Sequence, residues 1–143
     1  MNYKIEIVKD QNEDFVIRAR QASPMLEKME RLLQESDKQL FGYTENGVVR
    51  LEEESVDCFL TEGGRIYALT KEGKYLVKER LFQLEKRFSI GFVKINQSCL
   101  VNTLAIERFE TSIGGSLRVV LRYGYKDYVS RRQLKTVKER IGI

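Results

Sequence analysis

The sequence contains no histidine, and this absence excludes several common kinds of active site. Ser-His-Asp and Cys-His catalysis both need an imidazole, and so does a zinc site with a histidine ligand. The only cysteines, Cys58 and Cys99, are too few for a four-thiolate zinc site and form no disulfide framework. We therefore expect two reduced thiols, no metal site and no other cofactor.

Long apolar runs and nucleotide-binding loops are also missing. No run approaches the roughly 20 apolar residues that span a bilayer, and residues 1–10 mix charged with apolar side chains, unlike a signal peptide. Neither G-x-x-x-x-G-K-[ST] nor G-x-G-x-x-G occurs. The acidic run at residues 52–54 is typical of a solvated turn. These absences favour a cytoplasmic protein that has no small-molecule substrate and is not an enzyme; a small enzyme is the less supported alternative.

Charge is distributed unevenly along the chain. Residues 94–143 contain ten Lys and Arg against four Asp and Glu, a net charge of +6, whereas the whole chain carries +4. Residues 1–36 contain six basic and seven acidic residues, which makes them poor candidates for binding a polyanion. A basic last third with interspersed Ser, Asn and Gln favours contact with nucleic acid.

Residues 1–36 are predicted to form an extension of two strands and a helix. Apolar and polar residues alternate over 3–8, the composition of 15–20 is also typical of a strand, and Ser23-Pro24 is typical of a helix start. Met and Leu recur at helical spacing over 25–33. This stripe is typical of core packing, and a docking face for a partner or a second copy is the alternative.

Residues 37–143 are predicted to form a second region of short strands and tight turns. Asn46-Gly47 is a strong hairpin signal, and two later turns join three strands into a meander rather than a βαβ unit. The predicted strands cover 40–44, 48–51, 56–61, 66–70, 75–77, 92–95, 104–111, 117–123 and 126–129. The fold class is therefore α+β and mostly β.

Two helices are predicted in this second region. The first covers residues 80–88 and places its large apolar side chains on one face. Ser130 can cap the second, which turns its apolar side chains inward. The apolar residues are Leu81, Phe82, Leu84 and Phe88 in the first helix, and Leu134, Val137 and Ile141 in the second.

Two polar segments carry chemistry that suits nucleic acid. Arg can donate two hydrogen bonds to guanine O6 and N7, and Ser and Lys can hold phosphates. Ser130-Arg131-Arg132 would combine these groups with the free N–H groups of a helix start, and Gln97-Ser98 occupies a bend between strands. A solvated helix start and a simple turn are the alternatives. No helix-turn-helix, basic heptad or RNP motif is present.

The order of these motifs resembles the LytTR DNA-binding domain of bacterial transcription regulators. The resemblance covers about residues 37–143 and is carried by the leucine-containing segment 80–85, by Phe88 and by three later segments. It implies an elongated antiparallel β fold that binds repeated sites as a pair, inserts loops into successive major grooves and bends the duplex. The three later segments are 92–98 (Phe-Val-Lys-Ile-Asn-Gln-Ser), 100–102 (Leu-Val-Asn) and 129–132 (Val-Ser-Arg-Arg).

The resemblance also implies roles for individual residues. Arg132 falls where the family places a base reader, Gln97 and Ser98 fall in the middle contact loop, and Arg65 falls in the first loop. Backbone contacts are implied for others, and Asn102 is implied to be structural. The predicted DNA-binding set is Arg65, Lys94, Asn96, Gln97, Ser98, Arg122, Ser130, Arg131, Arg132 and Lys135.

The sequence departs from the family pattern in both early loops and at its N-terminus. Gly63-Gly64 and Asn96 stand where members often have a His or a long polar residue. Residues 1–36 are too short for a receiver domain, so the chain resembles stand-alone LytTR regulators, which often act beside a restraining membrane protein. We therefore expect a homodimeric, sequence-specific regulator that binds double-stranded DNA. The alternative is a protein-interaction module that acts through the N-terminal helix and does not select DNA sequence.

Overall fold

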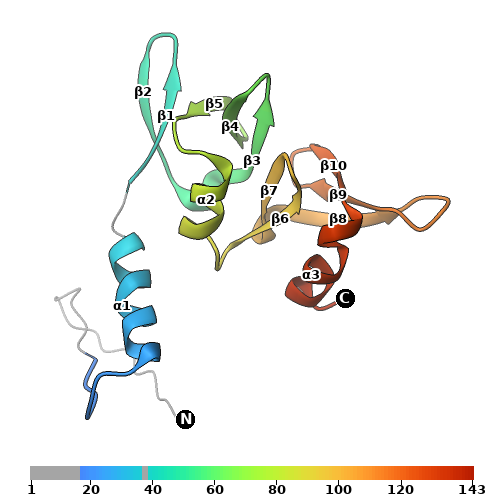
Figure 1. Cartoon of the computed structure of the whole chain (residues 1–143). Helices are drawn as coiled ribbons and strands as arrows, with labels where there is room; N and C mark the ends of the chain where they lie inside the picture. The colour runs from blue at the N-terminus through green and yellow to red at the C-terminus, as the bar shows by residue number, and fades with distance from the viewer. Residues whose placement is uncertain (1–16, 37–38) are drawn as a thin grey trace, which may run out of the picture. The chain divides into compact units, whose positions relative to one another are not determined.

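The computed structural model describes residues 17–36 and 39–143, and the chain divides into two units between Gln34 and Glu35. The first unit contains most of helix α1 (Pro24–Ser36). The second contains every strand of the described residues (Figure 1). The two units are described separately.

Helix α1 begins as the sequence predicts. Ser23 Oγ accepts a hydrogen bond from the Leu26 N–H at 3.2 Å, and Pro24 occupies the first helical position, where no N–H is needed. Met25 and Met29 are 50% and 40% exposed, so the apolar stripe is more exposed than a core interpretation predicts. The strand predicted over 15–20 is wrong for residues 17–20, which form no strand. The strand predicted over 3–8 lies outside the described residues.

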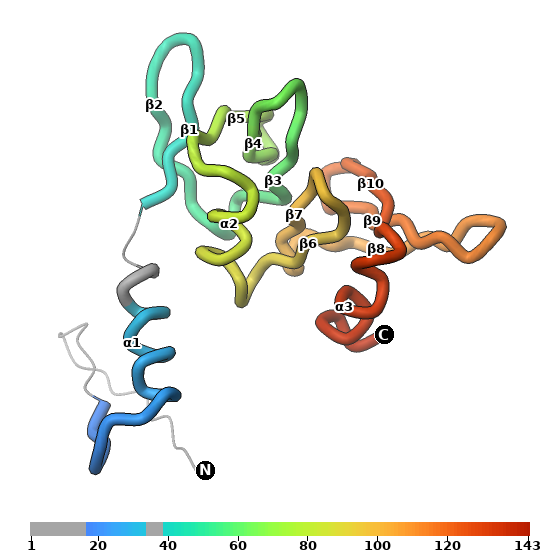
Figure 2. Tube along the Cα trace, viewed as in Figure 1, coloured from blue at the N-terminus to red at the C-terminus, as the bar shows by residue number. Residues whose placement is uncertain are grey.

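The second unit contains two antiparallel sheets and two α-helices, as the fold class predicts (Figures 1 and 2). The larger sheet has the order β2-β1-β5-β4-β3-β7-β6, and the smaller has the order β10-β9-β8. The helices are α2 (Leu81–Arg87) and α3 (Arg131–Ile141). The strands are β1 (Leu40–Thr44), β2 (Gly47–Leu51), β3 (Val56–Glu62), β4 (Arg65–Thr70), β5 (Gly73–Val77), β6 (Phe92–Asn96), β7 (Cys99–Asn102), β8 (Ile106–Thr111), β9 (Leu117–Leu121) and β10 (Lys126–Val129).

The predicted hairpin and meander are confirmed, with differences at the turns. Thr44 pairs with Gly47, so Glu45 and Asn46 form the two-residue turn and Gly47 already belongs to β2. Strand β7 was not predicted, because four residues between two bends give too short a pattern to read. The strand predicted from residue 104 begins at Ile106, because a short 3-10 helix occupies residues 103–105.

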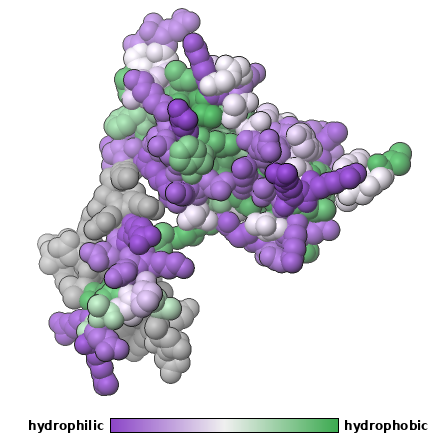
Figure 3. Space-filling view, viewed as in Figure 1, coloured by the Kyte–Doolittle hydropathy of each residue, from purple (hydrophilic) through white to green (hydrophobic). Residues whose placement is uncertain are grey.

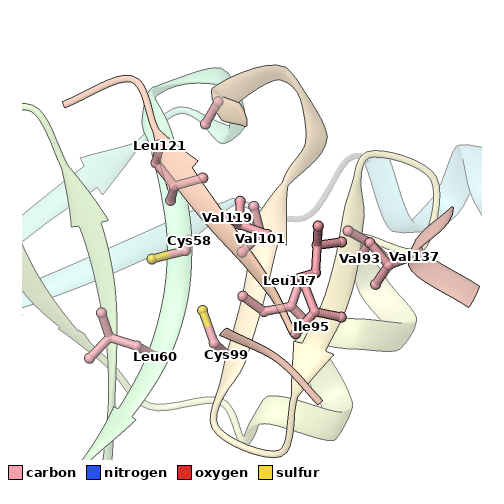
Figure 4. Close-up of a cluster of buried hydrophobic side chains, with 12 residues drawn as sticks. Cys58, Leu60, Val93, Ile95, Cys99, Val101, Leu117, Val119, Leu121 and Val137 are labelled. Carbon is pink, nitrogen blue, oxygen red and sulfur yellow. The ribbon is translucent and has the colours of Figure 1, made fainter. Parts of the chain in front are cut away.

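Two hydrophobic clusters cover opposite faces of the large sheet. Successive side chains of a strand point to opposite faces, so in β3 Phe59 faces helix α2 while Cys58 and Leu60 face the small sheet. Figure 4 shows the latter cluster, which includes Val137 of α3. Burial on both faces explains the continuous apolar runs of β3 and β7.

Helix α2 closes the cluster on the other face. Leu84 and Phe88 are buried there, and the rings of Phe59, Phe88 and Phe92 lie 5.2 to 5.6 Å apart between centroids. Phe82 is 59% exposed, so its predicted inward position is wrong. It directly follows Leu81, which packs against this cluster, and a step of one residue turns a helical side chain by about 100°.

Candidate nucleic-acid interface

The three predicted contact segments lie at the turn after β3, the turn after β6 and the start of α3, and backbone hydrogen bonds bring them together. The Thr61 N–H donates to Ser98 O at 2.8 Å, which joins the first turn to the second. The Ser130 N–H donates to Ile95 O at 2.8 Å, which joins the start of α3 to the strand before the second turn. The fold therefore gathers segments that are 30 or more residues apart in sequence (Figure 1).

The first turn contains Gly63 and Gly64 because its backbone needs them. Both residues have positive φ, +59° and +77°, a conformation that side chains with a Cβ rarely adopt. Arg65 follows directly and is exposed, opposite Glu62 in the ladder. The Glu62 carboxylate accepts a hydrogen bond from Lys74 Nζ at 2.6 Å, and this bond raises the pKa of the lysine. Arg65 thus stands beside a carboxylate that another cation already neutralises.

Asn96 holds the second turn in place. Its side chain is 2% exposed, and Nδ2 donates to Tyr128 O at 2.9 Å and to Asp127 Oδ1 at 3.2 Å. Its Oδ1 accepts a hydrogen bond from the Ser98 N–H at 2.8 Å. These bonds give Asn96 a structural role. Its predicted contact with DNA stays a prediction.

Asp127 is the residue that sequence reasoning missed at this junction. Besides Asn96, it accepts hydrogen bonds from the Tyr125 hydroxyl at 3.1 Å and from the Tyr128 N–H at 2.8 Å. Burial raises the pKa of Tyr125 and keeps the phenol neutral, so that it can donate. A single acid within the basic run 118–135 was the available sequence signal.

Gln97 and Ser98 form the exposed part of the second turn, as predicted. The ladder between β6 and β7 is irregular between Lys94 and Asn96, which breaks the alternation of faces at this point. Lys94 is half-buried next to the turn, whereas the other two side chains project into solvent. The second turn can therefore present one amide and one hydroxyl to a ligand.

The start of α3 combines positive side chains with the positive end of a helix. Ser130 occupies the N-cap position with extended backbone angles, but its hydroxyl makes no cap hydrogen bond, so its predicted capping role is wrong. Arg131 and Arg132 are exposed in the first turn, which contains no acidic residue, and Lys135 is exposed one turn later. Cations are unfavourable at this end of a helix unless an anion lies there. Figure 3 shows a mostly hydrophilic surface in this region.

Among the residues that the structure describes, Arg122 is the predicted contact residue that forms an ion pair with a buried acid. Its Nε lies 2.7 Å from Asp57 Oδ1, and Nη2 donates to Glu54 O at 2.6 Å. The Asp57 side chain is 1% exposed and that of Arg122 is 31% exposed. The Arg122–Asp57 ion pair holds the end of β9 against β3. The predicted phosphate contact of Arg122 stays a prediction.

Asn102 closes the opposite end of the β6–β7 pair. Its Nδ2 donates to Val56 O at 2.9 Å, and its Oδ1 accepts from the Leu104 N–H at 3.0 Å. The structural role implied for Asn102 is thereby confirmed. Each end of this strand pair is thus fixed by a buried asparagine.

Other kinds of site find little support in the described residues. Within 17–36 and 39–143, no three His, Cys, Asp or Glu residues are grouped to hold a metal ion. Cys58 and Cys99 are buried free thiols, and their mutual hydrogen bond, followed by burial, raises the pKa of Cys99. Among the helices of these same residues, none is long and apolar enough to cross a membrane.

Comparisons with known proteins agree with this geometry. The family model of the LytTr DNA-binding domain matches residues 46–142. Uncharacterized HTH-type transcriptional regulators from Staphylococcus aureus strains bovine RF122 / ET3-1 and NCTC 8325 / PS 47 are 33% identical over 104 residues, covering 73% of this chain and 71% of theirs. A LytTr DNA-binding domain of a methyl-accepting/DNA response regulator from Bacillus cereus superposes with a TM-score of 0.70 at 16% identity, covering 75% of this chain and 99% of that one.

Proposed function

This chain belongs to the LytTr family of bacterial DNA-binding transcriptional regulators, and from that premise we propose that it selects particular double-stranded DNA sites in the cytoplasm. The observation that carries the proposal is the convergence of the two exposed turns and the basic start of α3. The backbone bonds from Thr61 to Ser98 and from Ser130 to Ile95 support a single contact surface.

Groove reading would fall to the exposed side chains of these segments. Arg132 would donate to guanine O6 and N7, and Gln97 would meet a base edge from the second turn. Consecutive α-helices are absent from residues 39–143, which favours reading by turns and a helix start over a helix-turn-helix. Arg65 would take the base or phosphate facing the first turn.

Phosphates would be held by the hydroxyls and cations beside these readers. Ser98 and Ser130 can each donate an O–H, and Arg131 and Lys135 supply positive charge on exposed positions of α3. The free N–H groups at the start of α3 would face the same phosphate, and no acidic residue in the first turn of α3 would repel it. This combination supports contact with the phosphate backbone on each side of Arg132.

We further propose that two copies bind repeated half-sites through residues 37–143, with residues 1–36 as the contact between copies. The exposed Met and Leu side chains of α1 support this assignment, because covering an exposed apolar stripe removes it from water and lowers the free energy. The same stripe is the observation behind the second candidate function, a protein-interaction module. In that case a partner, such as a regulatory membrane protein, would cover α1.

Selection of bound sites from random duplexes by the full chain tests the proposal. We expect enrichment of a motif that is repeated at about one helical turn, followed by a gel shift that excess nonspecific duplex does not remove. A duplex that keeps only one of the two repeated motifs should bind more weakly if two copies of the chain bind together. No enrichment, together with capture of the chain by a partner through α1, would favour the interaction module instead.

A further inference from the structure

We propose a second DNA-contact surface on the large sheet: a row of exposed cations, Arg65, Lys78 and Arg50, that holds phosphates of the duplex flank beyond the first turn. This inference rests on the proposed function and adds to it the direction in which the contact surface extends. None of the three predicted contact segments includes Lys78 or Arg50.

The register of the ladder places Lys78 beside Arg65. Val77 pairs with Ile66 in the antiparallel β4–β5 ladder. Lys78, which follows Val77, therefore stands opposite Arg65, which precedes Ile66. Val77 and Ile66 pack into the cluster under α2. Because neighbouring residues of a strand point to opposite faces, Lys78 and Arg65 point away from that cluster. The position of Lys78 Nζ, 4.3 Å from the centroid of the Tyr43 ring, agrees with this direction.

The same register extends the row to β2. Tyr43 pairs with Leu76 across β1 and β5, so Phe41, two residues before Tyr43, faces Lys78, two residues after Leu76. Phe41 in turn pairs with Arg50. Directly opposed residues share a face of a sheet, so Arg65, Lys78 and Arg50 lie on one face, at the end of the sheet that carries the first turn.

The cations of this row are free to meet an anion. Among the described residues, neither Arg65 nor Lys78 forms an ion pair with a carboxylate. Arg50 Nε lies 3.9 Å from Glu52 Oε1, with both side chains more than 60% exposed, a geometry that contributes little in water. The nearest acid in the row, Glu62, already accepts a hydrogen bond from Lys74. The row thus carries unneutralised positive charge.

The strand order shows in which direction the row extends across the large sheet. Strands β4, β5, β1 and β2 are consecutive neighbours, and strands lie about 4.8 Å apart, so Arg50 stands about 14 Å beyond Arg65. A DNA strand places a phosphate every 3.4 Å or so along the axis, so this distance corresponds to about four phosphates. Helix α3 packs at the opposite edge of the sheet, on the edge strand β6, where Val137 meets Val93 (Figure 4). The row therefore extends the contact surface away from Arg132.

A salt titration with matched variants tests this surface. The full chain binds its selected site on a long duplex and on one shortened at the flank near the first turn. Lys78→Gln should flatten the slope of log affinity against log salt by about 0.9, and the double variant Arg50→Gln and Lys78→Gln by about 1.8. Both effects should disappear on the shortened duplex. Lys86→Gln is the control, because it removes one exposed charge from α2, on the opposite face.

The outcomes separate this inference from the proposed function. A wild-type chain that selects its site, together with a double variant that keeps the wild-type slope on the long duplex, overturns the row and leaves the proposed function standing. Equal flattening by Lys86→Gln also overturns it, since net charge would then explain the effect. A wild-type chain that selects no sequence overturns both. Thermal melting followed by circular dichroism verifies that each exposed Gln variant is folded.

Discussion

Replacing Asn96 with alanine should loosen the whole contact surface without removing a phosphate contact. The substitution removes two hydrogen bonds donated by Nδ2 and one accepted by Oδ1, at a side chain that is 2% exposed. It leaves Tyr128 O and the Ser98 N–H without these partners. A buried polar group without its partner costs about 1–3 kcal/mol. Because Ser98 is exposed and water can reach it, we expect a total loss of about 2–4 kcal/mol.

Chemical unfolding and DNA binding measure the two consequences separately. Urea unfolding followed by circular dichroism gives the free energy of unfolding, and a domain of this size has about 5–15 kcal/mol, so the variant stays folded in the cold. Under those conditions its affinity for the selected site should fall toward that for random duplex. The slope of affinity against salt should stay unchanged, because Asn96 neutralises no phosphate.

Asn102→Ala is the matched control for this prediction. Asn102 is equally buried and makes equivalent hydrogen bonds at the far end of the same strand pair. It should therefore lower stability by a similar amount and leave site selection intact. The reasoning would be refuted if Asn96→Ala reduced site selection while changing the free energy of unfolding by less than about 0.5 kcal/mol, since Asn96 would then touch DNA directly.

Four further predictions concern single side chains. Arg132→Ala should weaken specific binding by about 1–3 kcal/mol, and equal binding of variant and wild type in a gel shift would reject the base-reading role. Lys135→Ala should lower affinity on all duplexes and flatten the salt slope by about one unit; an unchanged slope removes it from the phosphate contacts. Arg122→Ala should lower the free energy of unfolding by about 2–3 kcal/mol, the lower end for a buried pair because the arginine is partly exposed; an unchanged urea midpoint contradicts this. Burial, followed by repulsion from a neighbouring acid, raises the pKa of Glu53, so the folded protein favours the neutral carboxyl. The contribution of this neutral form to stability is fully present below the unfolded pKa of 4.5 and is lost as the pH rises through the higher pKa of the folded protein. Glu53→Gln should therefore gain stability relative to wild type at pH 7, and urea midpoints at pH 4 should show a smaller gap.

The strands of the meander and both helices of the second unit could be predicted because their signals are local. Short apolar runs between turn residues identify strands such as β3 and β4, and three apolar residues at helical spacing identify the buried face of α3. Ser23 could be identified as a cap because its partner is three residues away. Signals of this kind need no knowledge of distant contacts.

The hydrogen bonds that organise the contact surface could not be predicted in this way. Asn96 bonds a residue 31 positions later and another 32 positions later, and Arg122 pairs with an acid 65 positions earlier. In the sequence both look like exposed polar residues of a basic region, and the family pattern assigned them to DNA. Only the register of the folded chain turns them toward protein partners.

The same register suggests a division of labour among polar residues. Those with partners inside the protein, Asn96, Asn102 and Arg122, fix short turns whose backbone then has little freedom left to lose when a ligand binds. Arg132 and Lys78 form no ion pair with a carboxylate among the described residues, so their exposed charged ends can meet base edges or phosphates. The buried amide of Asn96, at the contact end of the β6–β7 pair, would therefore control whether the correct site is recognised, whereas exposed cations would control how tightly any duplex is held. Asn96→Ala should therefore change site selection at constant salt slope, whereas Gln variants of the cation row on the large sheet, Lys78 and Arg50, should change the slope at constant site selection.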